Sequence, residues 1–179
     1  RKEVESELKK VKLPSNFRCV LTGFGKVGHG AREIISLLPI KEVSAESFLN
    51  DTHLEPVFTH LDTHQYFARK ADNGFDKADF YANPENYKSN FAAFAQIADM
   101  YIPCHFWSAK SPLILTQDML RSAQNRIKLV ADISCDIAGP IACTIRPSKI
   151  GNSYYGYDPQ TGLEVPFDQA GAIAVMAVD

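Results

Sequence analysis

The hydrophobic residues of this chain fall into short apolar runs separated by segments with helical spacing. Apolar and β-branched runs predict strands at residues 18–22, 40–44, 57–61, 100–103, 128–133 and 172–179. Apolar residues at helical spacing predict helices over residues 26–38, 45–50, 83–97 and 117–124, with Ser44 and Thr116 as caps of the second and fourth. Strands that alternate with helices favour an α/β fold, a doubly wound, mostly parallel sheet with helices on both faces.

A glycine motif, G-F-G-K-V-G, lies between the first predicted strand and its helix. In that context it is the fingerprint of a Rossmann-type dinucleotide site. Gly23 permits the tight turn, Gly25 lets a pyrophosphate approach the backbone, and Gly28 lets the helix pack closely on the strand, while the helix N-terminus attracts the phosphates. The alternative is a strand–turn–helix whose glycines serve packing alone. The predicted cofactor-binding residues here are Gly23, Phe24, Gly25, Lys26, Val27 and Gly28.

Two further strand ends are candidates because ligands of such sheets lie beyond the carboxyl ends of the strands. The end of the strand at residues 100–103 predicts cofactor contacts from Pro103 and Cys104. The end of the strand at residues 128–133 predicts contacts from Asp132 and Ser134 and a catalytic role for Asp136 near the nicotinamide ring. The alternative for both carboxylates is to cap a loop by accepting backbone N–H bonds. His105 follows Cys104, but adjacency alone does not make a catalytic dyad, and Trp107 is expected near the same crevice.

Composition narrows the class of protein. With 179 residues, 45% of them hydrophobic, the chain can bury the core of one domain. The net charge of −2 favours neither nucleic acid nor a membrane surface as a partner, and no apolar run is long enough to span a bilayer. The four cysteines form no C-x-x-C pair, which indicates reduced, mostly buried thiols of a cytoplasmic protein.

The three histidines His53, His60 and His64 invite a metal interpretation, since the last two are four residues apart. No cysteine or carboxylate accompanies them at a useful spacing. Buried or solvated histidines are therefore expected, and no metal site is predicted.

Four ordered segments resemble one known family. Residues 20–31 are similar to the nucleotide-binding opening of the lysine–ketoglutarate reductase and saccharopine dehydrogenase group, within the alanine dehydrogenase and transhydrogenase superfamily. Residues 83–91 (NPENYKSNF) resemble its H-P-E-R-Y-x-S-x-F segment, and residues 130–136 (VADISCD) its D-[IV]-S-x-D turn. The run YGYD at residues 155–158 and residues 175–179 resemble the approach to its last nucleotide-domain strand.

The resemblance implies a function. Members of this group condense lysine with 2-oxoglutarate to saccharopine using a reduced nicotinamide cofactor, or run the related oxidative cleavage. Their nucleotide domain lies between two segments of a catalytic domain, which supplies most acid–base groups and binds the amino-acid and 2-oxo-acid substrates. In alanine dehydrogenases a D-x-x-x-D-Q-G-G segment places an aspartate at the nicotinamide. Asp132 and Asp136 match it, whereas residues 137–139 depart from Q-G-G.

The two ends of the chain fit this arrangement. It opens in a charged helix over residues 1–12, with Val4, Leu8 and Val11 on one stripe, and stops in a strand-like run. We therefore expect an excised fragment of a longer enzyme: residues 1–13 as a linker helix from the absent catalytic domain and residues 14–179 as the NAD(P)-binding Rossmann domain. Alone it should bind cofactor and catalyse nothing, and a homo-oligomer is compatible with it.

The residues themselves do not decide between NAD and NADP as the cofactor. The resemblance favours NADP, and NAD stays open because an acidic residue near the end of the second strand would bind the ribose 2′-hydroxyl. Glu42 lies at that distance but inside the predicted strand; no arginine stands nearby for a 2′-phosphate, although Lys41 and the distant Arg69 could serve. Two other classes remain open, a non-catalytic nucleotide-sensing module and an S-adenosylmethionine-dependent methyltransferase.

Overall fold

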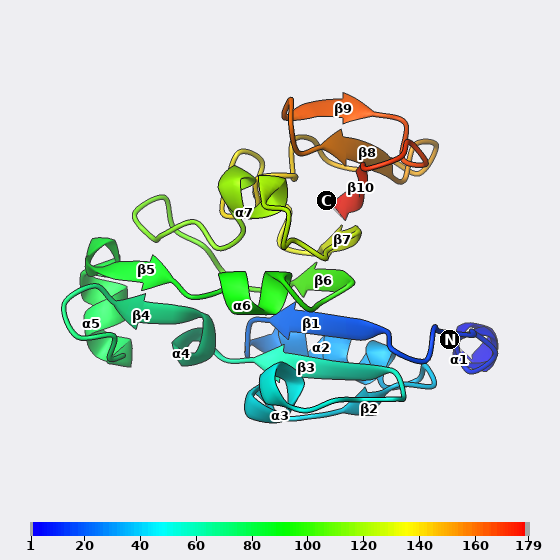
Figure 1. Ribbon diagram of the computed structural model, residues 1–179, viewed down its shortest axis with the longest axis horizontal. Helices are drawn as coiled ribbons and strands as arrows, with labels where there is room; N and C mark the ends of the chain where they lie inside the picture. Colours follow the sequence, from blue (N-terminus) through cyan, green and yellow to red (C-terminus); the bar gives the residue numbers. More distant parts are fainter. Residues whose placement is uncertain (1, 178–179) are drawn as a thin grey trace.

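An eight-stranded sheet runs through the computed structural model, which describes residues 2–177 (Figure 1). Its strand order is β2-β3-β1-β6-β7-β10-β8-β9, with parallel pairing up to β10 and antiparallel pairing beyond it. The predicted α/β class with a mostly parallel sheet is confirmed. The strands are β1 (Arg18–Thr22), β2 (Lys41–Glu42), β3 (Val57–Leu61), β6 (Met100–Pro103), β7 (Leu129–Asp132), β8 (Tyr155–Asp158), β9 (Leu163–Val165) and β10 (Ile173–Ala177).

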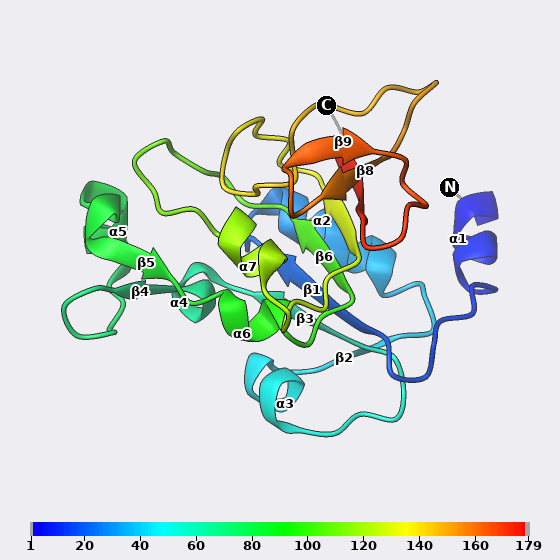
Figure 2. The ribbon, with the colours of Figure 1, turned by 45° about the horizontal axis from the view of Figure 1, so that its top comes forward.

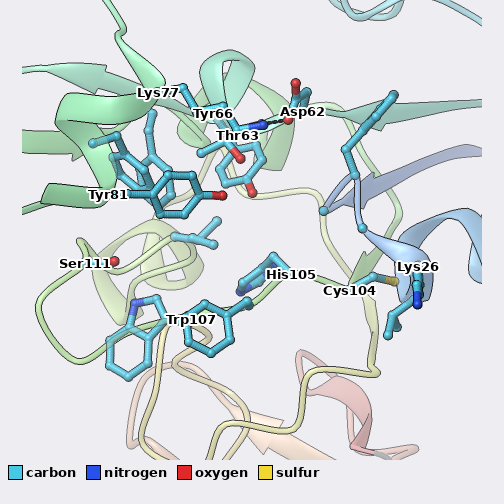
Figure 3. A pocket seen from close by; sticks show the side chains of 18 residues that line it. Lys26, Asp62, Thr63, Tyr66, Lys77, Tyr81, Cys104, His105, Trp107 and Ser111 are labelled. Atoms are coloured by element: carbon cyan, nitrogen blue, oxygen red, sulfur yellow. Dashed lines mark hydrogen bonds between the residues drawn. The ribbon is translucent and has the colours of Figure 1, made fainter.

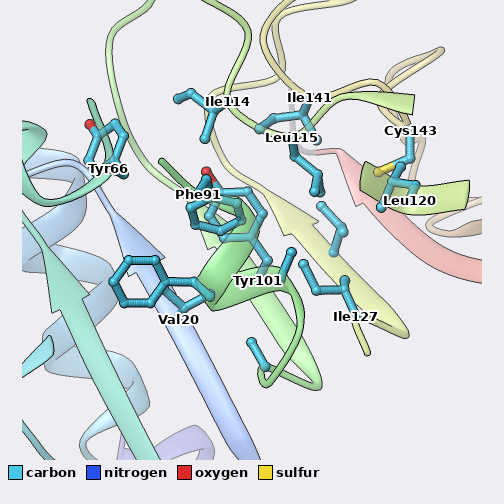
Figure 4. Close-up of a cluster of buried hydrophobic side chains, with 14 of the residues drawn as sticks. Val20, Tyr66, Phe91, Tyr101, Ile114, Leu115, Leu120, Ile127, Ile141 and Cys143 are labelled. Atoms are coloured by element: carbon cyan, nitrogen blue, oxygen red, sulfur yellow. The ribbon is translucent and has the colours of Figure 1, made fainter. Parts of the chain in front are cut away.

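Helices cover both faces of the sheet, as Figure 2 shows. Side chains of β1 alternate between the faces, so Cys19 and Leu21 pack with Ile35 of α2 (Lys26–Ile35) on one face. Val20 points to the other face, into the larger cluster drawn in Figure 4, which α3 (Ala45–Asn50), α6 (Ala92–Ala95) and α7 (Gln117–Arg121) help to close. Phe91 and Tyr101 meet in that cluster with ring centroids 4.4 Å apart.

The strand next to β1 is β3, not the second strand in the chain. β2 pairs only with β3 and forms the edge of the sheet. In the usual dinucleotide-binding order the second strand lies beside the first. Here the end of β3 therefore lies beside the glycine turn, and the end of β2 lies one strand farther away.

An insertion of residues 63–99 connects β3 to β6; its first part, up to β5, stands beside the sheet, and α6 at its end packs on the sheet (Figure 1). It contains α4 (Thr63–Tyr66), β4 (Phe67–Arg69), α5 (Lys77–Ala82), the 3₁₀ turn η1 (Pro84–Asn86), β5 (Tyr87–Ser89) and α6. The predicted continuous helix over residues 83–97 is wrong in its middle, where β5 pairs antiparallel with β4, whereas η1 and α6 on either side are helical. The hydroxyl of Tyr87 donates to Asp79 (2.7 Å) and that of Ser89 to the Ile114 carbonyl (2.9 Å), which holds this segment extended.

Several other boundaries differ from those predicted. The helix α2 ends at Ile35 rather than at residue 38, α7 ends at Arg121 rather than 124, and the predicted strand 40–44 shortens to β2. At the N-terminal end, α1 (Lys2–Leu8) ends at Leu8 rather than at residue 12 and buries no side chain; Val4 of its apolar stripe is 59% exposed. Residue 1 of the predicted helix and residues 178–179 of the predicted last strand lie outside the described residues.

The segment between β7 and β10 adds the hairpin of β8 and β9 to the sheet, with Tyr155 and Tyr157 buried. Within residues 2–177, no helix combines the length and apolar character needed to cross a bilayer.

Candidate functional site

The turn after β1 requires glycine at two positions. Gly23 has a φ of +102°, and a Cβ there would lie 2.5 Å from the carbonyl oxygen of Cys104. A Cβ on Gly28 would lie 1.7 Å from the carbonyl oxygen of Gly23. The predicted tight turn and the close approach of helix to strand are therefore confirmed in their geometry.

Gly25 differs from both, because a Cβ there would have no protein atom within 4 Å. It is the N-cap of α2, its backbone is extended, and no side chain caps the helix. Within the described part of the chain, the N–H groups of Phe24 and Gly25 have no hydrogen-bond acceptor. The turn thus presents free donors and the positive end of a ten-residue helix to open space.

A cavity of about 370 Å³, the first cavity, opens in front of this turn. Six of the predicted site residues line it: Gly23, Phe24, Gly25, Lys26, Val27 and Cys104. The opposite wall comes from the insertion, through Tyr66, Lys77 and Tyr81, and from the loop after β6, through His105 and Trp107 (Figure 3). Trp107 thus lies where the sequence places it.

Sequence reasoning missed the wall made by the insertion. Asp62 and Thr63 line the cavity directly after β3, where Asp62 caps α4 by accepting from the N–H of Thr63 (2.7 Å). An aspartate at the end of a predicted strand was the available signal. Lys77 and Tyr81 come from α5, a helix that the local pattern of polar and apolar residues does not predict.

A second cavity of about 470 Å³ lies at the ends of β2 and β3, and Phe24 lines both cavities. Glu42, the last residue of β2, lines it together with Ser44, Thr59 and His60. The expectation that no arginine stands near is wrong, since Arg32 of α2 holds the Glu42 carboxylate through three contacts of 2.7–2.9 Å. The helical repeat, not sequence proximity, brings these two groups together.

The other cations considered for a 2′-phosphate are engaged elsewhere. Lys41 pairs with Glu55 at 3.1 Å, and Arg69 lies 3.5 Å from Asp72 within the insertion. Neither lines the first or the second cavity.

The turn after β7 is organised by Asp132, which is fully buried. One carboxylate oxygen accepts from the Ser134 N–H (3.0 Å), the Ser134 hydroxyl (2.6 Å) and the Cys135 N–H (3.1 Å), and the other accepts from the Thr144 hydroxyl (2.6 Å). Four donors thus occupy this carboxylate, which matches the loop-capping alternative.

Asp136 lies half-buried farther along the same loop. Burial, reinforced by the negative charge of Asp132, raises the pKa of its carboxyl group. Cys135 and Ala138 on either side have φ values of +50° and +53°, a left-handed conformation that costs non-glycine residues about 1 kcal/mol each. The loop is tied to the end of β6, since the Pro103 carbonyl accepts from the N–H groups of residues 133 and 134.

The structure therefore divides the predicted residues into two groups. The glycine turn and Cys104 share the first cavity, whereas Pro103, Asp132, Ser134 and Asp136 lie together at the ends of β6 and β7, outside its lining. Gly28 is also outside the lining, buried against Gly23.

His105 and Cys104 do not form a dyad. The Nδ1 atom of His105 lies 3.0 Å from the Thr22 hydroxyl, which in turn lies 2.8 Å from the Tyr101 hydroxyl. The Cys104 thiol points to the Ile102 carbonyl (3.7 Å), and burial raises its pKa to about 12. Burial also lowers the pKa of His105 to about 4, so its ring is neutral at physiological pH.

The other histidines have separate environments. The Nε2 atom of His60 lies 2.7 Å from the Gly23 carbonyl oxygen, that of His53 lies 3.0 Å from the Ser47 carbonyl oxygen, and Nδ1 of His64 lies 3.6 Å from Asp62. Over residues 2–177, no group of three or more histidine, cysteine or acidic side chains is placed to hold a metal ion.

Comparison with known proteins finds a distant similarity, while no family model matches the chain. The chain is 28% identical, over 180 aligned residues, to alpha-aminoadipic semialdehyde synthase of Arabidopsis thaliana. The alignment covers 89% of this chain and 17% of that relative, so the chain spans about a sixth of the relative's length. This distant similarity supports a relationship to the saccharopine dehydrogenase and lysine–ketoglutarate reductase group.

Proposed function

We propose that this chain is the dinucleotide-binding unit of an NAD(P)-dependent oxidoreductase of lysine or related amino-acid metabolism. The observation that carries the proposal is Gly25, where the backbone faces open space at an uncapped helix N-terminus. A Cβ would fill the space that a phosphate needs, and free N–H groups are the donors that phosphates prefer. The residues present therefore fit a pyrophosphate.

The adenosine and nicotinamide parts of a dinucleotide would lie on opposite sides of this turn, along the edge of the sheet where the strands end. The second cavity lies beside the turn at the ends of β2 and β3, where adenosine would bind; the ends of β6 and β7 lie on the other side. There Pro103, Cys104 and Ser134 would border the nicotinamide. We assign Asp132 an indirect part, since its four hydrogen bonds hold the loop that carries Ser134 and Asp136.

A bound nicotinamide supplies hydride transfer, and the chain's residues prepare its surroundings. Tyr66, Tyr81 and Trp107 give the first cavity an aromatic wall that excludes water. Asp136, whose pKa burial raises, would exchange a proton at its carboxyl group near the ring in the proposed catalytic role. NADP is the preferred cofactor in this proposal because the motif resemblance favours it; Arg32 does not itself line the second cavity but pairs with Glu42, which does, and NAD is the alternative.

The substrate belongs to the parts of the parent protein outside this chain. The relative is named for alpha-aminoadipic semialdehyde, and the motif resemblance points to saccharopine formation or cleavage. We propose that an amino acid and a 2-oxo acid bind through a separate catalytic domain. In this proposal residues 14–179 form the cofactor domain of a cytoplasmic enzyme, residues 1–13, which include α1, are the linker, and the fragment alone is inactive.

Titration with NADPH and with NADH tests the proposal. Trp107 is the only tryptophan and lines the first cavity, so its quenching and its energy transfer to the reduced nicotinamide report binding. We expect saturable binding, checked by calorimetry, with the tighter cofactor identifying the 2′-substituent.

Two alanine variants make the test specific. Gly25→Ala should leave stability unchanged, since its Cβ meets no protein atom, yet weaken dinucleotide binding about tenfold or more by blocking the phosphate. Gly30→Ala, also in open space but beyond the turn, should bind like wild type. Absence of binding by the wild type at millimolar concentration would refute the proposal, and S-adenosylmethionine would be tested next.

A further inference from the structure

His60 joins the glycine turn from the neighbouring strand. It is the fourth residue of β3, is 7% exposed, and its Nε2 atom lies 2.7 Å from the Gly23 carbonyl oxygen. A carbonyl oxygen only accepts, so Nε2 carries the proton and donates. The Phe24 ring stacks on the imidazole at 4.4 Å between centroids.

The Gly23 carbonyl is the part of the turn that most needs a restraint. Glycine rotates freely about its backbone bonds, and Gly23 has a φ of +102°. Because the peptide group is planar and trans, fixing the Gly23 oxygen also fixes the direction of the Phe24 N–H. That N–H is one of the free donors beside the uncapped end of α2.

The environment of His60 favours a role for this one bond over simple packing. Its Nδ1 atom is buried and has no partner within the described residues. An unpaired buried nitrogen costs free energy that a leucine of similar size would not. Gly28 packs against both atoms of the hydrogen bond between His60 and Gly23. A Cβ at Gly28 would lie 1.7 Å from the Gly23 oxygen and 3.0 Å from Nε2 of His60.

We propose that His60 is a positioning residue for the pyrophosphate of the cofactor. Its Nε2–H holds the Gly23 carbonyl against β3 and thereby presets the N–H group of Phe24 as a phosphate donor beside that of Gly25. This inference rests on the proposed function, because the donors matter only if a phosphate binds there.

Four variants test it. Gln carries its amide nitrogen about where Nε2 of histidine lies, Asn is too short to reach Gly23, and Leu has no donor. We expect His60→Leu and His60→Asn to weaken NADPH or NADH binding about tenfold, the effect of one lost hydrogen bond, and His60→Gln to stay within about threefold of wild type. His53→Leu is the matched control, because it removes the same kind of bond to the Ser47 carbonyl away from the turn.

The amide resonances of Phe24 and Gly25 in ¹⁵N-labelled protein provide a second readout. They should shift in His60→Leu and His60→Asn without ligand and stay near the wild-type positions in His60→Gln. Equal affinities of all His60 variants, or equal losses in the Gln and Asn variants, would overturn the inference. If His60→Leu does not fold, the comparison of Gln with Asn still decides it. A wild type that binds no dinucleotide would instead refute the proposed function.

Discussion

The turns after β1 and β7 lie at the same edge of one sheet and are stabilised in opposite ways. The glycine turn is held from outside, by the Cys104 backbone above Gly23 and by His60 from β3. Its own N–H groups at Phe24 and Gly25 stay free. The turn after β7 is held chiefly by its own Asp132 carboxylate, which accepts four hydrogen bonds from residues 134, 135 and 144, and the Pro103 carbonyl of β6 adds a second support.

This difference shows how a binding turn can be told from a structural one. Buried donors and acceptors are normally paired. A turn that is rigid yet leaves donors unpaired is ready for a ligand, whereas a turn that satisfies itself is ready only to carry other side chains. By this criterion the glycine turn is the one suited to a ligand, and Asp132 holds Ser134 in place.

The largest effect should come from Gly28→Ala. Its Cβ would overlap the Gly23 carbonyl oxygen at 1.7 Å, and neither backbone segment can move away. We expect a loss of more than about 4 kcal/mol of unfolding free energy, or no folded protein, measured by urea denaturation. Gly30→Ala in the same helix should gain about 0.5–1 kcal/mol. Equal stabilities of the two variants would mean that the turn is not held as tightly as described.

Asp132→Ala should have the next largest effect. It removes the carboxylate that accepts from the Ser134 hydroxyl and from the buried Thr144 hydroxyl, and we expect about 3 kcal/mol of destabilisation in urea. Thr144→Val removes only one of the four bonds and should cost about 1 kcal/mol. A tolerated Asp132→Ala that abolished dinucleotide binding would instead make this aspartate a direct ligand contact.

Acid should weaken the support beneath the glycine turn through His105, which contacts Thr22 at the end of β1. The folded chain takes up this proton near pH 4, whereas the unfolded chain takes it up near pH 6.5. Protonation therefore favours unfolding: the contribution is absent above pH 6.5, and stability falls between pH 6.5 and 4 by about 3 kcal/mol.

His105→Asn tests this pH dependence. The Asn amide can replace Nδ1 toward Thr22 but does not titrate, so this part of the acid dependence of the urea midpoint should disappear. His64→Asn, an exposed histidine, is the control. An unchanged acid slope in His105→Asn would contradict the assignment.

The smallest effect should come from Glu42→Gln at the second cavity. Removing a negative charge beside Arg32 should favour a 2′-phosphate, raising the preference for NADPH over NADH by about threefold, since the pair is partly exposed. Glu46→Gln on α3, which does not line the cavity, should change nothing. A shift of the cofactor preference toward NADH would contradict the placement of the adenosine 2′-position beside Arg32 and Glu42.

Much of this architecture could be predicted from local pattern. β1, β3 and β6 match their predicted residues, α3 begins at the predicted Ser44 cap, and the glycines occupy the predicted turn. Each of these depends on nearby sequence: a buried run, a side-chain cap, or a backbone that only glycine can adopt.

The errors of the sequence-based predictions arise where contacts between distant segments of the chain determine the structure. β5 forms because β4, about twenty residues earlier, pairs with it, and isolated helical spacing around Tyr87 could not reveal this. The placement of β3 between β1 and β2, and the contact of Arg32 with Glu42, also follow from tertiary packing. The two parts of the candidate site that the sequence missed, the wall from the insertion and the Arg32–Glu42 pair, both have this origin.

The edge position of β2 has a consequence for motion. Two backbone bonds flank this two-residue strand, from the Lys41 N–H to the Pro56 carbonyl and from the Val43 N–H to the Phe58 carbonyl, both 2.9 Å. Such an edge opens locally at far lower free energy than the core strands, so its amide protons will exchange with solvent first. The side of the second cavity that carries Glu42 and Val43 therefore opens more readily than the core. Whatever fills that cavity will be detected first as slowed hydrogen exchange at the amides of Lys41 and Val43.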